Sequence, residues 1–238
     1  MDKIKENKTT VIATLLVALV PMLVGICLWN QMPDTIATHF GSDGTANGWN
    51  SKGFAVYGLP LILLAAQVVM IIVMATDPSK KGISDRLFRL ILWFMPLVSV
   101  YCCVGIYAVA VKGEDYSMSL FGYNFCLILF GVVLMVFGNA LPKARLNYSF
   151  GIRVRWTLSS TKNWEATHRF GSYIMFAGGF LIFILGVVAT FVSMNRILGW
   201  LSIAAITIVM IAVMTLYSYI YYLRHKNDPD YNNTEEQE

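Results

Sequence analysis

Residues Gly138–Gly171 read GNALPKARLNYSFGIRVRWTLSSTKNWEATHRFG and join two long apolar segments. The stretch carries six Lys or Arg residues and one acid, Glu165, among Gly, Asn, Pro, Trp, Ser and His residues that favour specific turns and contacts. The apolar segments on either side, Tyr116–Pro142 and Phe170–Asn195, contain no charged residue. A polar loop placed in this way predicts a structured connection between two membrane-spanning helices.

The same pattern repeats along the chain. The composition is 57% hydrophobic and 13% charged over 238 residues, whereas a soluble domain carries about 25% charged residues. Stretches free of Asp, Glu, Lys and Arg, each longer than the roughly 20 residues that a helix needs to cross a bilayer, are Thr9–Pro33, Gly53–Thr76, Leu90–Val111, Tyr116–Pro142, Phe170–Asn195 and Ile197–Leu223. We therefore expect an all-α, polytopic membrane protein with six transmembrane helices, because helices satisfy their own backbone groups in lipid.

The distribution of basic residues predicts the orientation in the plasma membrane. If the amino terminus is cytoplasmic, 15 of the 18 Lys and Arg residues fall on the inner side, and Lys52, Lys112 and Arg196 fall outside. Cytoplasmic loops carry such an excess, so we expect both termini inside. The net charge of +4 then belongs to the inner surface, in contact with the lipid bilayer, and does not indicate direct nucleic-acid binding.

We divide the chain into three parts. Residues 1–89 hold the first two spans with a structured outer loop, 31–52, and residues 90–226 hold four spans with the inner loop 138–171. The polar, acidic residues 227–238 are expected to form a disordered tail. All four cysteines lie inside apolar segments, which is typical of small buried side chains and predicts no disulfide framework.

The outer loop, Gln31–Lys52, reads QMPDTIATHFGSDGTANGWNSK and is rich in turn-forming residues. Asn-Gly favours tight turns because glycine accepts positive φ, so Asn47-Gly48 is expected to close a small hairpin. Phe40 and Trp49 interrupt the polar run, and a simple tether would need neither. We expect a compact, folded loop.

In the inner loop, Asn139, Pro142 and Lys143 are expected to end the fourth helix, because proline cannot continue the hydrogen-bond ladder. Weak alternation predicts a short extended segment at Tyr148–Trp156. Ser159 or Ser160 then caps a helix that carries Trp164 and His168 on one face and runs into the fifth span. His168 is interpreted as a hydrogen-bonded structural residue in preference to a general base. In the second span, Gln67 is interpreted as making an interhelical hydrogen bond.

Catalytic and metal-binding patterns were weighed and set aside. His39 with Asp34 and Asp43 matches no metal-ligand spacing, so we expect no metal and no cofactor. Ser159, Ser160 and His168 share one loop, but helix capping accounts for the serines and no third catalytic group is evident. We therefore expect a protein that is not an enzyme.

The inner loop resembles the signature of the SdpI-like bacterial immunity family. The matching residues are Gly138, Asn139, Leu141, Pro142, Lys143, Asn147, Phe150, Gly151, Ile152, Arg153, Trp156, Thr157, Leu158, Ser159, Ser160, Trp164, Thr167, His168, Arg169 and Gly171. The outer loop is similar to the DUF1648-type domain that often precedes the signature, through Pro33, Asp34, Ile36, His39, Phe40, Gly44, Trp49, Ser51 and Lys52. Two residues depart from the family pattern: Arg155 stands where the family often has Pro, and Asn47 where it often has Asp.

The resemblance implies protection of a Gram-positive cell from a secreted, membrane-active peptide toxin. In the founding system the immunity protein also acts as a receptor that holds a cytosolic helix-turn-helix repressor at the membrane. We expect the outer-loop residues to face the toxin and the inner-loop residues to dock a partner or to hold the inner mouth of the bundle. Two alternatives stay open: a small permease or exporter with a polar path around Gln67 and Asn139, and an intramembrane enzyme using His168.

Overall fold

The computed structural model describes residues 2–41, 45–79, 83–113, 123–192, 195–228 and 231. Among them are six helices that are long and apolar enough to cross a membrane, as the sequence predicts: Lys8–Cys27, Phe54–Ala75, Asp85–Lys112, Asn124–Lys143, Thr161–Phe191 and Ile197–His225. The prediction of a polytopic helical membrane protein is therefore confirmed.

Packing divides the chain into two compact units, each described here by itself. Unit 1 comprises Met1–Thr76 and Phe88–Phe125, and unit 2 comprises Asp77–Leu87 and Cys126–Glu238. The third span thus packs with the first two, and the linker after the second span packs with the last three. The sequence-based division at residue 89 separates groups of spans by the loops between them and not by packing, and it stays a prediction.

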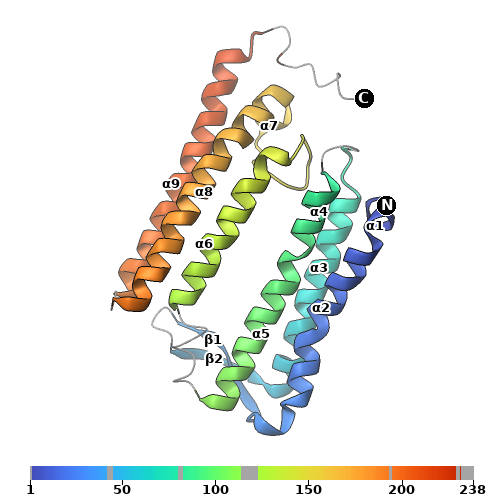
Figure 1. The fold of residues 1–238 in the computed structure, drawn as a ribbon, viewed down its shortest axis with the longest axis vertical. Helices are drawn as coiled ribbons and strands as arrows, with labels where there is room; N and C mark the ends of the chain where they lie inside the picture. The colour runs from blue at the N-terminus through green and yellow to red at the C-terminus, as the bar shows by residue number, and fades with distance from the viewer. Residues whose placement is uncertain are drawn as a thin grey trace. The chain divides into compact units, whose positions relative to one another are not determined.

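Unit 1 consists of three long helices and a small β-hairpin (Figure 1). Its elements are α1 (Asp2–Glu6), α2 (Lys8–Cys27), the 3₁₀ turn η1 (Trp29–Gln31), β1 (Thr35–Phe40), β2 (Ala46–Ser51), the π-helical turn η2 (Phe54–Gly58), α3 (Leu59–Ala75) and α5 (Phe94–Lys112), with α4 (Asp85–Leu92) leading into α5.

Gln67, in the middle of α3, satisfies a carbonyl group that a proline leaves free. Pro96 lies in the first turn of α5 and has no N–H, so the carbonyl of Leu92, four residues earlier, lacks its helical partner. Gln67 donates from Nε2 to Leu92 O at 3.0 Å and to Thr14 Oγ1 of α2 at 3.3 Å. Gln67 and Thr14 are fully buried. The interhelical hydrogen bond expected for Gln67 is confirmed.

Unit 2 consists of α6 (Tyr123–Ala140), the 3₁₀ turn η4 (Leu141–Lys143), α7 (Arg155–Leu158), α8 (Thr161–Phe191) and α9 (Arg196–His225). As predicted, α8 is one continuous helix from the inner loop through the fifth span. Ser160 caps it, because its side chain accepts from the Asn163 N–H at 3.3 Å. The predicted extended segment Tyr148–Trp156 is wrong over most of its length, since residues 148–151 form bends and α7 already begins at Arg155.

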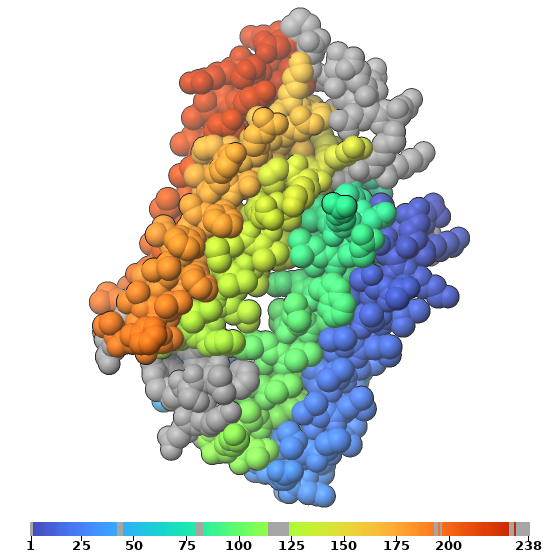
Figure 2. All heavy atoms as spheres, in the orientation of Figure 1, coloured from blue at the N-terminus to red at the C-terminus, as the bar shows by residue number. Residues whose placement is uncertain are grey.

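Glycines allow α8 to contact both of its neighbours closely. A Cβ at Gly131 of α6 would lie 2.5 Å from Phe183 N and 2.6 Å from Gly179 O of α8. Gly178, the residue before Gly179 in α8, faces the other neighbour: a Cβ there would meet the side chain of Met210 of α9. In lipid, helices associate largely through van der Waals packing, and small residues permit the closest backbone approach. Figure 2 shows the atoms of α8 (orange) directly against those of α6 (yellow-green).

The expected disordered tail, 227–238, contains one residue that the structure places in the core of unit 2. Tyr231 is 2% exposed, and its hydroxyl lies between α7 and α8. The ring and the hydroxyl of Tyr231 both have partners, and the disorder of the tail stays a prediction. Residues 229–230 and 232–238 lie outside the described residues.

Candidate functional site

The outer loop is folded, as expected, into an antiparallel hairpin, but its turn is not at Asn47-Gly48. Both residues lie within β2, where Gly48 pairs with His39 of β1. A Cβ at Gly48 would lie 3.0 Å from the Cβ of His39, so this glycine serves a close cross-strand approach. The turn itself falls between Phe40 and Ala46. The prediction was wrong because cross-strand register, which the local dipeptide does not reveal, places Asn47-Gly48 in the strand.

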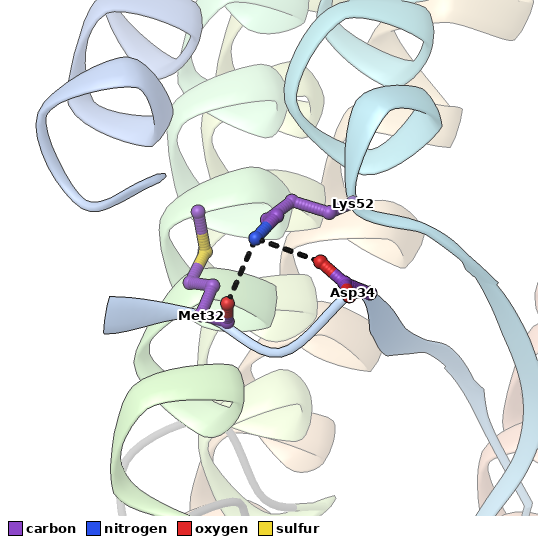
Figure 3. Close-up of polar contacts among 3 residues, drawn as sticks. All are labelled: Met32, Asp34 and Lys52. Atoms are coloured by element: carbon purple, nitrogen blue, oxygen red, sulfur yellow. Dashed lines mark hydrogen bonds and ion pairs between the residues drawn. The ribbon is translucent and has the colours of Figure 1, made fainter. Parts of the chain in front are cut away.

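Lys52 fastens the base of the hairpin (Figure 3). Its Nζ lies 3.1 Å from Asp34 Oδ1 and donates to Met32 O at 3.1 Å. It also lies 5.0 Å from the centre of the Trp29 ring, within the range of a cation–π contact. The Lys52 side chain is 13% exposed, whereas that of Asp34 is fully exposed. The ion pair is therefore the weakest of these contacts, because solvent screens it.

Below the hairpin, an apolar cluster ties the strands to the helices of unit 1. Ile36 of β1 and Met32 pack with Val56, Cys103 and Tyr107. The Tyr107 hydroxyl donates to Ala55 O at 3.1 Å, so the buried phenol is satisfied. This packing fixes the Ile36 face of the hairpin to the helices.

The predicted outer-loop residues are mainly exposed. The indole side chain of Trp49 is 54% exposed. His39 is exposed, and its Nδ1–H donates to Asn47 Oδ1 at 2.5 Å. Also exposed are Pro33, Asp34 and Ser51, Phe40 and Lys52 are half-buried, and Gly44 lies outside the described residues. In the described part of the chain no group of three His, Cys, Asp or Glu residues could hold a metal ion.

We expect Lys52→Met to loosen the hairpin far more than Asp34→Asn. The first change removes the hydrogen bond to Met32 and the cation–π contact, while the second removes a screened ion pair. Hydrogen exchange of the β1 and β2 amides should rise roughly tenfold or more in Lys52→Met, equivalent to one charged hydrogen bond. Equal exchange in the two variants would show that the ion pair holds the base.

At the inner end of unit 2, Asn147 organises the loop that follows η4. Its Nδ2 donates to Arg145 O at 2.8 Å, and its Oδ1 accepts the N–H groups of Ser149 at 2.9 Å and Phe150 at 2.7 Å. The side chain is fully buried. Asn147 is therefore a structural residue, because its amide replaces the backbone partners that an irregular loop lacks.

His168 and Trp164 form a stacked pair that supports the next turn of the loop. The two rings are 4.0 Å apart and nearly parallel, at 21°. His168 Nδ1 lies 2.7 Å from Trp164 O, and His168 Nε2 accepts the Ile152 N–H at 3.0 Å. Nδ1 therefore carries the proton, and neither ring nitrogen has a lone pair free to act as a base. The geometry agrees with the structural interpretation of His168.

Trp164 and Thr157 fix the two ends of the loop. Trp164 Nε1 donates to Ala144 O at 2.8 Å. Thr157 Oγ1 accepts the Val154 N–H at 3.1 Å and lies 2.8 Å from Ile152 O, which holds the first turn of α7. Arg155 occupies the first position of α7, where proline is also well accommodated, so the departure from the family pattern needs no change of backbone.

The exposed residues of the inner loop are mostly basic. Arg153 donates from its guanidinium to Tyr148 O and is exposed. Trp156 is partly buried against α9, where its Nε1 donates to Ser218 Oγ at 2.7 Å and its ring lies 5.1 Å from that of Tyr219. The exposed cations of the loop and adjoining helix are Lys143, Arg145, Arg153, Arg155, Lys162 and Arg169, and Asn139 and Pro142 are exposed beside them.

Two residues that sequence reasoning missed, Asp77 and Asn163, complete the site. Asp77, in the linker after α3, accepts the Tyr148 N–H at 3.0 Å and the Ser149 hydroxyl with Oδ2. Asn163 and Thr167 form a buried pair at 2.8 Å on α8, and of these only Thr167 was expected. Asp77 is separated from Tyr148 by 71 residues, so no local pattern indicates the contact.

The segments of this chain that match known protein families contain the two loops described above. Residues 143–218, which include most of the inner loop and all of α8, match the SdpI/YfhL protein family, and residues 16–64, which include the hairpin, match the domain of unknown function DUF1648. Over 222 residues the chain is 23% identical to the Immunity protein SdpI of Bacillus subtilis (strain 168), covering 90% of this chain and 96% of that relative. The chain is thus similar to SdpI-like proteins. No solved structure matches it.

Six helices of the described residues are long and apolar enough to cross a membrane, so the chain is a multi-pass membrane protein. In the structure, the matched inner region is a loop whose buried residues hold its shape. Asn147, Thr157, Trp164, Thr167 and His168 are buried and Gly151 is half-buried, whereas the Lys and Arg residues of the loop are exposed.

Asp77 makes the inner loop sensitive to acid. Burial would raise the pKa of its carboxyl, but hydrogen bonds from Ser149, Ser79 and the Tyr148 N–H outweigh burial and lower it. The stabilising contribution of this carboxylate is therefore present above the ordinary pKa of an aspartate, about 4, and is lost as the pH falls through the lowered value.

We expect Asp77→Asn to release residues 148–150 at neutral pH, because an amide would present a donor to groups that donate. Limited proteolysis or hydrogen exchange of this segment should show faster opening in the variant, by roughly fivefold or more. The native chain should approach the variant only in strong acid. The idea would be abandoned if native and variant loops behaved alike at pH 7.

Proposed function

We propose that this protein protects a Gram-positive bacterium against a secreted, membrane-active peptide toxin. The observation that carries the proposal is the likeness over 90% of the chain to a protein described as an immunity protein. The proposal also agrees with a bundle whose folded loops lie at the ends of its spans. Both termini are proposed to be cytoplasmic, because 15 of the 18 Lys and Arg residues then lie inside.

The hairpin of unit 1 is proposed to be the toxin-facing surface. It is held from below by Ile36 and Met32 and clasped at its base by Lys52, so its outer face is rigid before any partner arrives. A rigid surface loses less conformational entropy on binding than a flexible tether. Trp49 offers a large, exposed aromatic side chain, the type of residue that most often dominates a binding interface.

The immunity proposal is tested in a sensitive Gram-positive host. Cells that express the protein should survive several membrane-active peptides of this class, or at least one of them, at concentrations that kill cells with an empty vector. Trp49→Ala should reduce survival while membrane levels stay unchanged. A matched control is Trp200→Ala, which removes a part-exposed indole from α9 and leaves the hairpin intact. Unchanged killing with every peptide would refute the proposal.

We also propose that the exposed cations of unit 2 dock a cytosolic helix-turn-helix repressor, making the protein a receptor as well as an immunity factor. Arg153 is the best single test, because it is exposed and bonded to the loop by one backbone carbonyl. Trp156 is a poorer choice, since its indole is bonded to Ser218 and its loss would disturb packing. Candidate repressors can be captured with native and Arg153→Ala protein in membranes.

Arg153→Ala should reduce repressor recruitment without reducing membrane levels. Lys112→Ala serves as control, because it removes a basic residue from the opposite end of a span. Equal recruitment by native protein and Arg153→Ala would remove Arg153 from the docking surface. Loss of recruitment together with intact immunity would separate the two roles.

A further inference from the structure

The residue that stands out beyond the proposed function is Tyr231. It follows the last described residue of the α9 end, Asp228, whose carbonyl accepts the Tyr231 N–H at 3.0 Å. Its hydroxyl accepts from Asn163 Nδ2 at 2.9 Å and donates to Trp156 O at 3.3 Å. Its ring lies 6.0 Å from that of Tyr222, at 58°. A single side chain thus connects α7, α8 and α9.

The surroundings of the Tyr231 hydroxyl are held in place by contacts that do not include Tyr231. Asn163 is fully buried and donates a second hydrogen bond to Ser218 O at 3.1 Å, while its Oδ1 accepts from Thr167 at 2.8 Å. Trp156 is fixed separately by Ser218 Oγ at 2.7 Å. One side-chain N–H of Asn163 and the backbone carbonyl of Trp156 therefore converge on one point, where they can bind a group that both accepts and donates a hydrogen bond.

A tyrosine side chain satisfies that requirement. Its hydroxyl is at once an acceptor for Asn163 and a donor to Trp156 O, and its ring supplies the apolar contact with Tyr222. A phenylalanine would keep the ring contact and leave a buried amide proton without a partner, which is costly. A serine could not reach across the width of the ring. The chemistry selects a phenol.

We propose that Asn163, Trp156 and Tyr222 form a binding site for a tyrosine side chain, and that Tyr231 of the same chain occupies it reversibly. We infer reversibility because Tyr231 lies beyond the end of α9 at His225 and outside any helix or strand, and such segments open locally at the lowest cost. When Tyr231 leaves, Asn163 is still held by Ser218 and Thr167, and α7 loses one of its supports. The site then accepts a tyrosine from another peptide.

This inference extends the proposed docking role, and it rests on that role only where a docked partner is said to supply the tyrosine. A partner that presents a tyrosine at this site would exchange with Tyr231, and it would meet an α7 freed to move. The existence of the site, however, is a property of the protein alone. Its test requires neither toxin nor repressor, so failure of the site and failure of the proposed function are distinguishable.

The test is hydrogen exchange of the full-length protein in detergent micelles. The amides of Thr157, Leu158 and Ser159 report on α7, because each is bonded within its single turn. Tyr231→Ala should raise their exchange by about five- to thirty-fold, the effect of losing one or two buried hydrogen bonds. Tyr231→Phe should give a smaller rise, at the lower end of that range. Tyr219→Phe, beside the same indole ring, is the matched control and should change nothing.

A synthetic peptide of residues 227–238 provides the second arm. Added at millimolar concentration to Tyr231→Ala, it should restore the protection of α7, and the same peptide with phenylalanine in place of tyrosine should restore less. If the α7 amides exchanged at the native rate in both Tyr231 variants, the proposal would be overturned. It would also be overturned if the tyrosine peptide did not restore the protection of α7 in Tyr231→Ala. Loss of protection throughout α8 and α9 would also overturn it, since Tyr231 would then be a core residue and no reversible occupant.

Discussion

Gly151→Ala is expected to be among the most disruptive single changes in the inner loop. Gly151 has a φ of 124°, a region that is open almost exclusively to glycine. A Cβ there would lie 2.2 Å from His168 Nε2 and 3.0 Å from the Trp164 ring. Both rings are buried and bonded, so neither can move away. Backbone strain and the lost Ile152–His168 hydrogen bond should together cost about 3 kcal/mol or more.

The measurement is thermal unfolding of purified protein in detergent, with hydrogen exchange of residues 150–154 as a local probe. A fall in melting temperature of roughly 5–10 °C is expected for a chain of this size. Gly53→Ala is the control, because its φ is −59° and a Cβ would meet nothing within 4 Å. If both variants melted at the native temperature, the claim that position 151 requires glycine would be incorrect.

Gly131→Ala is expected to separate α6 from α8. The added Cβ would lie 2.5 Å from Phe183 N and 2.6 Å from Gly179 O, and both atoms belong to the rigid backbone of α8. The helices would have to move apart along their contact, losing the van der Waals packing that holds them together in lipid. Overpacking of this kind typically costs about 1–3 kcal/mol, and here the upper part of the range is expected.

Gly178→Ala is the informative comparison for Gly131→Ala. Its Cβ would meet the end of the Met210 side chain, which is flexible and can turn aside. Gly178→Ala should therefore melt closer to the native protein than Gly131→Ala does. The reverse order would mean that α8 adapts on its α6 side and is held tightly on its α9 side.

The parts of the fold that the sequence predicts are those determined by local chemistry. Charge-free stretches of more than 20 residues define the six spans because the bilayer imposes the length. The Ser160 cap and the continuity of α8 were also predictable, since a capping residue and one helical face lie within a few turns of each other. Gln67 was recognisable as a hydrogen-bonding residue, although its partner at Leu92 was not.

What escaped prediction depends on contacts between distant segments. The carboxylate of Asp77 reaches Tyr148 across 71 residues. Tyr231 is buried by Asn163, 68 residues earlier, although its own neighbourhood is polar and acidic. Asn47-Gly48 has the composition of a turn, yet pairing with β1 draws it into a strand. In each case tertiary structure determines the conformation, and the local sequence carries a different or weaker preference.

The length of α8 has a mechanical consequence. Its 31 residues correspond to a rod of about 46 Å, longer than the roughly 30 Å of hydrocarbon it crosses. Trp164 and His168 are mounted on the overhanging end. If the rod pivoted by about ten degrees around its midpoint, that end would swing by about 4 Å. A small change in the tilt of α8 within the lipid would thereby displace the inner loop and its exposed Lys and Arg residues.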